Sequence, residues 1–158
     1  MIDIMKEIKN FFIASVEYGD FAIENGILSV NEDYLIGQYI YIPGAVQRSN
    51  EVVGSVLNEG IYLAQDTLIT LAGVQDEVWT GAVCGLAIPQ DFIELANEIA
   101  VFQAEASKSP ATGALQSESY GGYQYARAVA ASGLPATWRD VYAGRLNKYR
   151  RLSMPQIL

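Results

Sequence analysis

Apolar residues recur at helical spacing at the start of the chain. They are Ile4, Ile8, Phe11 and Phe12, and charged or amide side chains separate them. This spacing predicts a short amphipathic helix over residues 1–15. From about residue 20 to residue 88 the period changes to two and β-forming residues dominate, which is typical of strands. Asn25-Gly26 lies between two of these runs and predicts a two-residue hairpin.

Further strands are expected where β-forming residues are bounded by glycine, proline or acidic residues. These runs cover residues 34–42, 60–64, 67–71 and 78–84. The stretch 44–58 has weak patterning and predicts a long loop or a flexible hairpin. Several short strands at this spacing indicate a small barrel or a curled antiparallel sheet.

Two helices are predicted in the C-terminal part. Pro89 stands at a helix start, where proline is favoured. The apolar stripe that follows it consists of Phe92, Leu95, Ala96, Ile99 and Phe102. Thr137 and Asp140 form the pattern of a capping box at the start of the second helix. The residues expected to face the core after this cap are Trp138, Val141, Tyr142, Leu146 and Tyr149.

The stretch 106–135 separates the two helices. It begins as a loop and continues as a strand-like link, residues 117–125, with three tyrosines and a Gly-Gly pair. The sequence therefore predicts an α+β fold: an N-terminal helix, a β-rich segment at 20–88, and two C-terminal helices joined by this Tyr/Gly link within a helical segment at 89–151. At 158 residues the chain is expected to form a single domain, residues 1–158.

The charge of the chain is unevenly distributed. The net charge is −8, but residues 1–105 carry −13 and residues 106–158 carry +5. An acidic body with a basic end suits head-to-tail contacts between copies, or a lumen that repels DNA. The other interpretation is that the basic residues form the solvated face of one helix.

Composition restricts the possible chemistry. The chain has no histidine and one cysteine, Cys84, which excludes Ser-His and Cys-His catalysis and predicts a buried, inert thiol. No apolar run is long enough to cross a bilayer and the N-terminus does not resemble a signal peptide, so we expect no membrane contact and a cytoplasmic site of synthesis. Carboxylate-only catalysis remains open.

Three groups of residues are candidates for chemistry. The acidic pairs Glu32-Asp33 and Asp76-Glu77 suit acid–base work or a cation, but solvated turn carboxylates are the simpler interpretation. Gly121-Gly122 lacks the lysine of a phosphate-binding loop. The tyrosines at 120, 123 and 125 with Arg127 could stack nucleic-acid bases, but in an acidic chain they favour a protein interface. We therefore assign no catalytic, cofactor or metal residue.

Two segments resemble a known family. SESYGGYQY at 117–125, followed by TWRDVYAGRLNKYRR at 137–151, is similar to the C-terminal half of phage head–tail connector (adaptor) proteins. The stretches 37–42, 58–62 and 88–96 resemble a subgroup found in Firmicute phages and prophages. Gln124, where a small hydroxyl residue is usual, and the stretch 45–54 depart from the family pattern.

The resemblance implies a structural virion protein without cofactor that assembles in the bacterial cytoplasm. Such subunits form a ring, often of twelve copies, at the neck of the virion between the portal protein and the tail, with DNA as passing cargo. The expected partner-interface residues are Glu118, Tyr120, Gly121, Gly122, Tyr123, Tyr125, Arg139, Arg145, Lys148, Arg150 and Arg151. The alternatives are another neck or tail ring protein (tail completion or tail terminator), a small ligand-binding β-barrel, or a carboxylate-dependent hydrolase.

Overall fold

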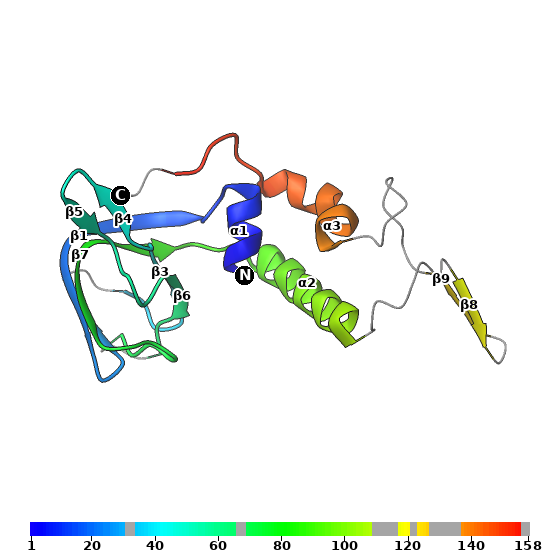
Figure 1. The fold of residues 1–158 in the computed structure, drawn as a ribbon, viewed down its shortest axis with the longest axis horizontal. Helices are drawn as coiled ribbons and strands as arrows, with labels where there is room; N and C mark the ends of the chain where they lie inside the picture. The colour runs from blue at the N-terminus through cyan, green and yellow to red at the C-terminus, as the bar shows by residue number, and fades with distance from the viewer. Residues whose placement is uncertain (31–33, 66–68, 109–116, 121–122, 127–136, 156–158) are drawn as a thin grey trace. The chain divides into compact units, whose positions relative to one another are not determined.

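A computed structural model describes residues 1–30, 34–65, 69–108, 117–120, 123–126 and 137–155 (Figure 1). For residues 106–108, 117–120 and 123–126 it describes only the backbone. The chain divides into two compact units, Met1–Gln90 with Arg151–Leu158, and Asp91–Arg150. Helices and strands occur in the order of an α+β fold, as predicted.

The N-terminal helix is shorter than the sequence predicts. Helix α1 covers Ile2–Ile8 and ends because Lys9 adopts a left-handed conformation (φ 57°). Phe12 also has a positive φ, and strand β1 begins at Ile13. The prediction of a helix to residue 15 was therefore wrong. Phe11 continues the helical spacing, but its ring stacks on Tyr41 of the sheet, with 4.4 Å between the centroids.

Two long antiparallel strands form the centre of the first unit. Strand β1 (Ile13–Glu24) pairs with β7 (Glu77–Leu86) from Ile13↔Leu86 to Ile23↔Glu77. At its end β1 turns into β2 (Ile27–Ser29) through Asn25 and Gly26. Both turn residues have left-handed φ values, 54° and 79°. This confirms the hairpin predicted from the Asn-Gly pair.

The remaining strands complete a curled sheet. Strands β3 (Tyr39–Ile42) and β6 (Gly60–Leu63) extend it to the order β2-β1-β7-β3-β6, with antiparallel pairing throughout (Figure 1). Strand β3 starts later than predicted because Gly37 (φ 80°) makes a turn. The strand expected at 67–71 is absent from the described residues 69–71, where Thr70 forms an isolated bridge to Ile27. Of the two options for 44–58, the structure has a hairpin, β4 (Val46–Arg48) with β5 (Glu51–Val53).

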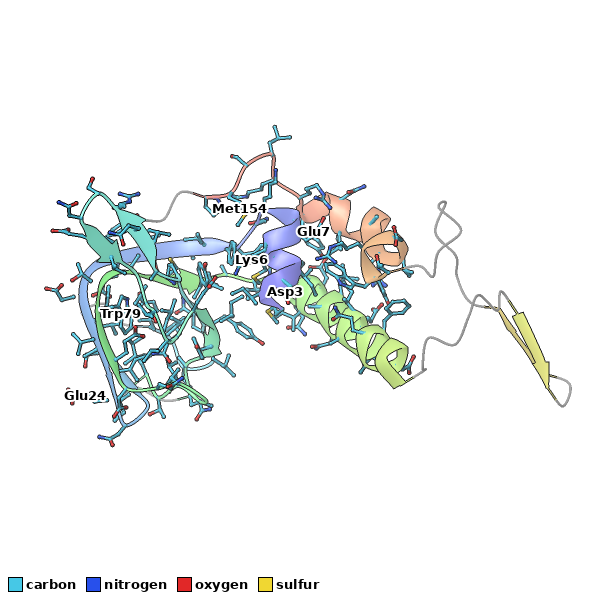
Figure 2. All side chains as sticks on the ribbon, viewed as in Figure 1. Asp3, Lys6, Glu7, Glu24, Trp79 and Met154 are labelled. Carbon is cyan, nitrogen blue, oxygen red and sulfur yellow. The ribbon has the colours of Figure 1, made fainter. Side chains whose placement is uncertain are left out.

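The main core lies on one face of the curled sheet. Phe21 and Trp79 face each other there across β1 and β7, with 5.5 Å between their rings. Figure 2 shows Trp79 inside the curve of the strands. The other buried members of this core are Ile23, Leu28, Tyr34, Ile40, Ile42, Ala64, Ile69, Leu71 and Val83.

The second unit contains helices α2 (Gln90–Lys108) and α3 (Trp138–Leu146), followed by the 3-10 turn η1 (Asn147–Tyr149). The capping box is confirmed: the Thr137 backbone N–H donates to Asp140 Oδ2 at 2.8 Å. Four of the predicted stripe residues in α2 are buried and Phe102 is partly buried. In α3 the prediction was wrong for Val141, which is 44% exposed. None of the described helices is long and apolar enough to span a membrane.

We expect Gly81→Ala to lower the free energy of unfolding by about 1–3 kcal/mol. A Cβ atom at this position would lie 2.9 Å from the backbone nitrogen of Gly54, so the hairpin β4–β5 or strand β7 must shift. Gly144→Ala in α3 is the control, because a Cβ atom added there would meet nothing within 4 Å and alanine favours a helix. Urea unfolding measures both variants. Equal stability of Gly81→Ala and the wild type would contradict this packing.

Candidate partner interface

The Tyr/Gly link forms a β-hairpin. Strand β8 (Ser117–Tyr120) pairs with β9 (Tyr123–Ala126) in the register Glu118↔Tyr125 and Tyr120↔Tyr123. Opposite residues of a ladder share a face, and so do residues two apart in a strand. The backbone register therefore places the four predicted interface residues Glu118, Tyr120, Tyr123 and Tyr125 on one face of the hairpin.

The second face of the hairpin carries Ser119 and Gln124, which oppose each other in the ladder. The predicted interface residues Gly121 and Gly122 lie outside the described residues. Sequence analysis recognised the strand-like character of this segment but missed the pairing of its two halves. The missed signal is the Gly-Gly pair, one of the dipeptides that favour two-residue hairpins.

The hairpin is a sheet of only two strands in the part of the chain that the structure describes. Two-stranded sheets are at best marginally stable by themselves in water, and a third strand or a covering element stabilises them. Each strand of the hairpin pairs with the other along one edge. The outer edges therefore offer backbone N–H and C=O groups to a further strand.

Two of the predicted interface cations make ion pairs within the second unit. Arg145 of α3 pairs with Glu98 of α2, and Lys148 of η1 pairs with Asp91 at 2.7 Å. Hydrogen bonds from Arg145 and Lys148 lower the pKa of the Glu98 and Asp91 carboxyls, respectively. All four side chains are about half exposed, so each pair contributes little to stability, but together they link α2 to the end of α3.

The other predicted cations are exposed. The Arg139 guanidinium lies over the ring of Trp138, 4.5 Å from its centroid. Arg150 and Arg151 follow η1, and their side chains are also exposed. All five cations are thus exposed, and the acidic partners of Arg145 and Lys148 lie in α2. Their contact with another protein stays a prediction.

Aromatic contacts fix α3 on α2. The ring of Phe92 meets Tyr149 edge to face at 5.0 Å, and Phe102 meets Tyr142 in the same way at 5.8 Å. A shallow hollow beside the second pair is lined by Glu94, Asn97, Glu98, Val101, Phe102, Glu105 and Tyr142. In the described residues no group of three or more acidic or cysteine side chains is arranged to hold a metal ion.

Glu77 differs from the solvated turn carboxylate that the sequence predicts. Its carboxylate accepts hydrogen bonds from Ser55 Oγ at 2.5 Å, from the Val56 backbone N–H at 2.7 Å and from Asn58 Nδ2 at 2.8 Å, and the Leu57 N–H also donates to it. The prediction of a solvated carboxylate was therefore wrong for Glu77. The donors lie 19–22 residues earlier in the chain, so no local pattern reveals them.

The neighbouring candidates behave differently. Asp76 is exposed and accepts a hydrogen bond from the backbone N–H of Asn25 at 2.8 Å. Glu32 and Asp33 lie outside the described residues. Cys84 is fully buried, as predicted, and burial raises the pKa of its thiol to about 12. This thiol is therefore protonated at neutral pH and is a poor nucleophile.

The bonds to Glu77 fix a loop with an apolar surface. Val56 and Leu57 donate their backbone N–H groups to the carboxylate, and their side chains are 68% and 52% exposed. A fixed backbone with exposed apolar side chains is suited to contact with another protein. This loop was not among the predicted interface residues, since exposure cannot be read from the sequence pattern.

Comparison with known proteins gives no further assignment. No family model, no curated protein and no solved structure matches the chain.

We expect Glu77→Gln to lower the free energy of unfolding at neutral pH by about 1–2 kcal/mol, because an amide accepts fewer of these hydrogen bonds. Burial raises the pKa of Glu77, but the bonds from Ser55, Val56, Asn58 and Leu57 lower it more, so it lies below its ordinary value of 4.5. The stabilisation from this ionised carboxylate is therefore complete above pH 4.5 and disappears as the pH falls through the folded-state pKa.

Urea unfolding between about pH 3 and pH 7 measures this effect. The wild type should lose more stability than Glu77→Gln as the pH falls below 4.5. Asp76→Asn is the control, since a single backbone N–H is shown to donate to that carboxylate. Parallel pH profiles for the wild type and Glu77→Gln would show that the carboxylate does not organise the loop.

Proposed function

We propose that the chain is a structural subunit of a ring at the neck of a tailed-phage particle, a head–tail connector that joins the portal protein to the tail. In this role the subunit binds copies of itself and its neighbours along the DNA channel. It carries out no reaction and holds no cofactor. The DNA passes through the ring as cargo.

The observation that carries this proposal is the shared face of the hairpin. The segment that resembles the connector family places Glu118, Tyr120, Tyr123 and Tyr125 on one side of β8–β9. Tyrosine is enriched in protein interfaces because its ring buries a large area while its hydroxyl remains hydrogen-bonded. Three tyrosines and one carboxylate on one face of a two-stranded sheet are therefore suited to binding another protein.

Helix α3, which lies in the second segment that resembles the connector family, supports the same role. Its capping box fixes the start of α3, and Arg145 and Lys148 connect its last turns to α2. The two helices that flank the hairpin in the sequence, α2 and α3, are thus linked to each other by ion pairs. The exposed cations Arg139, Arg150 and Arg151 add positive charge that complements the acidic residues 1–105 of another copy.

The double substitution Tyr123→Ala/Tyr125→Ala tests the proposal. Interface tyrosines each contribute on the order of 2 kcal/mol or more when a partner buries them. We expect the variant to melt within a few degrees of the wild type and to fail in ring formation and head–tail joining. Native mass spectrometry and electron microscopy with the portal protein measure assembly, and calorimetry measures the melting temperature.

Ser119→Ala/Gln124→Ala is the matched control, because these residues oppose each other on the second face of the same hairpin. This control should assemble like the wild type. A tyrosine variant that melts much lower, with assembly reduced only in proportion, would show that the rings stabilise the monomer. A variant that joins heads to tails normally would contradict the proposed interface.

A further inference from the structure

The shallow hollow beside Phe102 and Tyr142 has both apolar and acidic lining. Val101, which is 58% exposed, lines it together with these two aromatic residues. Its acidic residues all come from α2 and are exposed: Glu94, Glu98 and Glu105. An exposed valine beside two aromatic side chains is a surface that another protein can cover. This surface is called the α2–α3 hollow below.

The charge of the α2–α3 hollow is negative. The three glutamates and Arg145, the partner of Glu98, together carry a charge of −2. Complementary charge guides association between proteins, and like charge opposes it. The segment that fits this hollow is therefore one that combines positive charge with apolar side chains.

Residues 150–155 have this composition. They read RRLSMP, with two arginines, two large apolar side chains and no acidic residue. Leu152 is 99% exposed and Met154 is 43% exposed, so the described chain leaves most of Leu152 in solvent. The side chains of Arg150 and Arg151 are also exposed. This segment has a charge of +2 and is called the basic tail below.

The backbone of the basic tail is held at the end of α1. The Arg151 backbone N–H donates to the Ile8 carbonyl at 2.9 Å, and Lys9 Nζ donates to the Leu152 carbonyl at 3.3 Å. The main chain is thus bonded on both sides of the Leu152 side chain, which itself points into solvent. A segment held in this way loses less conformational entropy on binding than a free peptide does. The bonds therefore favour presentation of Leu152 to another molecule.

We propose that the basic tail of one subunit binds in the α2–α3 hollow of a second copy of the chain. Leu152 then lies against the apolar lining, and the two arginines of the tail lie against the glutamates. This inference rests on the proposed ring and adds a second contact between neighbouring subunits. The contact is heterologous, because it unites two different surfaces, and such contacts close into rings when the rotation permits.

Crosslinking between two single-cysteine variants tests the contact directly. Chain with Ser153→Cys in the basic tail is mixed with isotopically labelled chain with Asn97→Cys in the hollow. A short bismaleimide is added to the full chains at high concentration or with the portal protein. Cys84 is fully buried, so the introduced thiols are the ones that react. We expect a product that joins one labelled and one unlabelled chain, which mass spectrometry identifies.

Gln103→Cys is the matched control for the hollow. Gln103 is exposed on α2 like Asn97, but it is not among the residues that line the hollow. Its thiol should therefore give much less of the mixed product with Ser153→Cys.

Leu152→Asp tests the same contact without a crosslinker. Aspartate removes the apolar contact and meets the glutamates of the hollow, so the concentration for half-assembly should rise at least about tenfold. The monomer should keep its melting temperature, because Leu152 is 99% exposed. Leu35→Asp adds the same charge at a leucine that is 75% exposed, and this control should assemble like the wild type.

The outcomes separate this inference from the proposed function. Rings that form without the mixed product, and with normal assembly of Leu152→Asp, would overturn the tail contact and leave the ring in place. Equal crosslinking of Asn97→Cys and Gln103→Cys would overturn the hollow as the binding site. A mixed product at high concentration, with no ring on the portal protein, would support the tail contact and contradict the connector role. A chain that does not assemble under either condition contradicts both proposals.

Discussion

The antiparallel pairing of β1 with β7 is the constraint on which the first unit depends. It joins residues separated by some sixty positions, from Ile13↔Leu86 to Ile23↔Glu77, and places Phe21 next to Trp79 in the main core. Four residues separate the end of α1 at Ile8 from the start of β1 at Ile13. Glu77, the first residue of β7, fixes the loop after β5.

The position of Glu77 at the start of β7 also gives the first unit an apolar surface. Its carboxylate fixes the loop in which Val56 and Leu57 are 68% and 52% exposed. In the second unit, the aromatic contacts and ion pairs between α2 and α3 fix the two helices that flank the hairpin in sequence. Among the described residues the hairpin β8–β9 is a two-stranded sheet, and its outer edges are suited to strand addition.

The sequence predicted those features whose causes are local. The Asn25-Gly26 turn depends on two adjacent residues, and the Thr137 cap depends on a residue three positions away, so both could be read directly. Prediction failed where the structure of a segment depends on residues far away in the sequence. Phe11 has helical spacing, yet its position is set by Tyr41, thirty residues later. The hydrogen bonds to Glu77 depend on sheet topology, which no periodicity contains.

Of the candidate site, the sequence indicated the hairpin residues but not the register that gathers Glu118, Tyr120, Tyr123 and Tyr125 on one face. The central claim is that this face and its strands build a ring. Electron microscopy of the purified chain mixed with its portal protein measures this most directly. Our account predicts closed rings coaxial with the portal protein, and it predicts that the Tyr123→Ala/Tyr125→Ala variant does not form them. Unassembled monomers, or a stable two-fold dimer that never binds the portal, would contradict it.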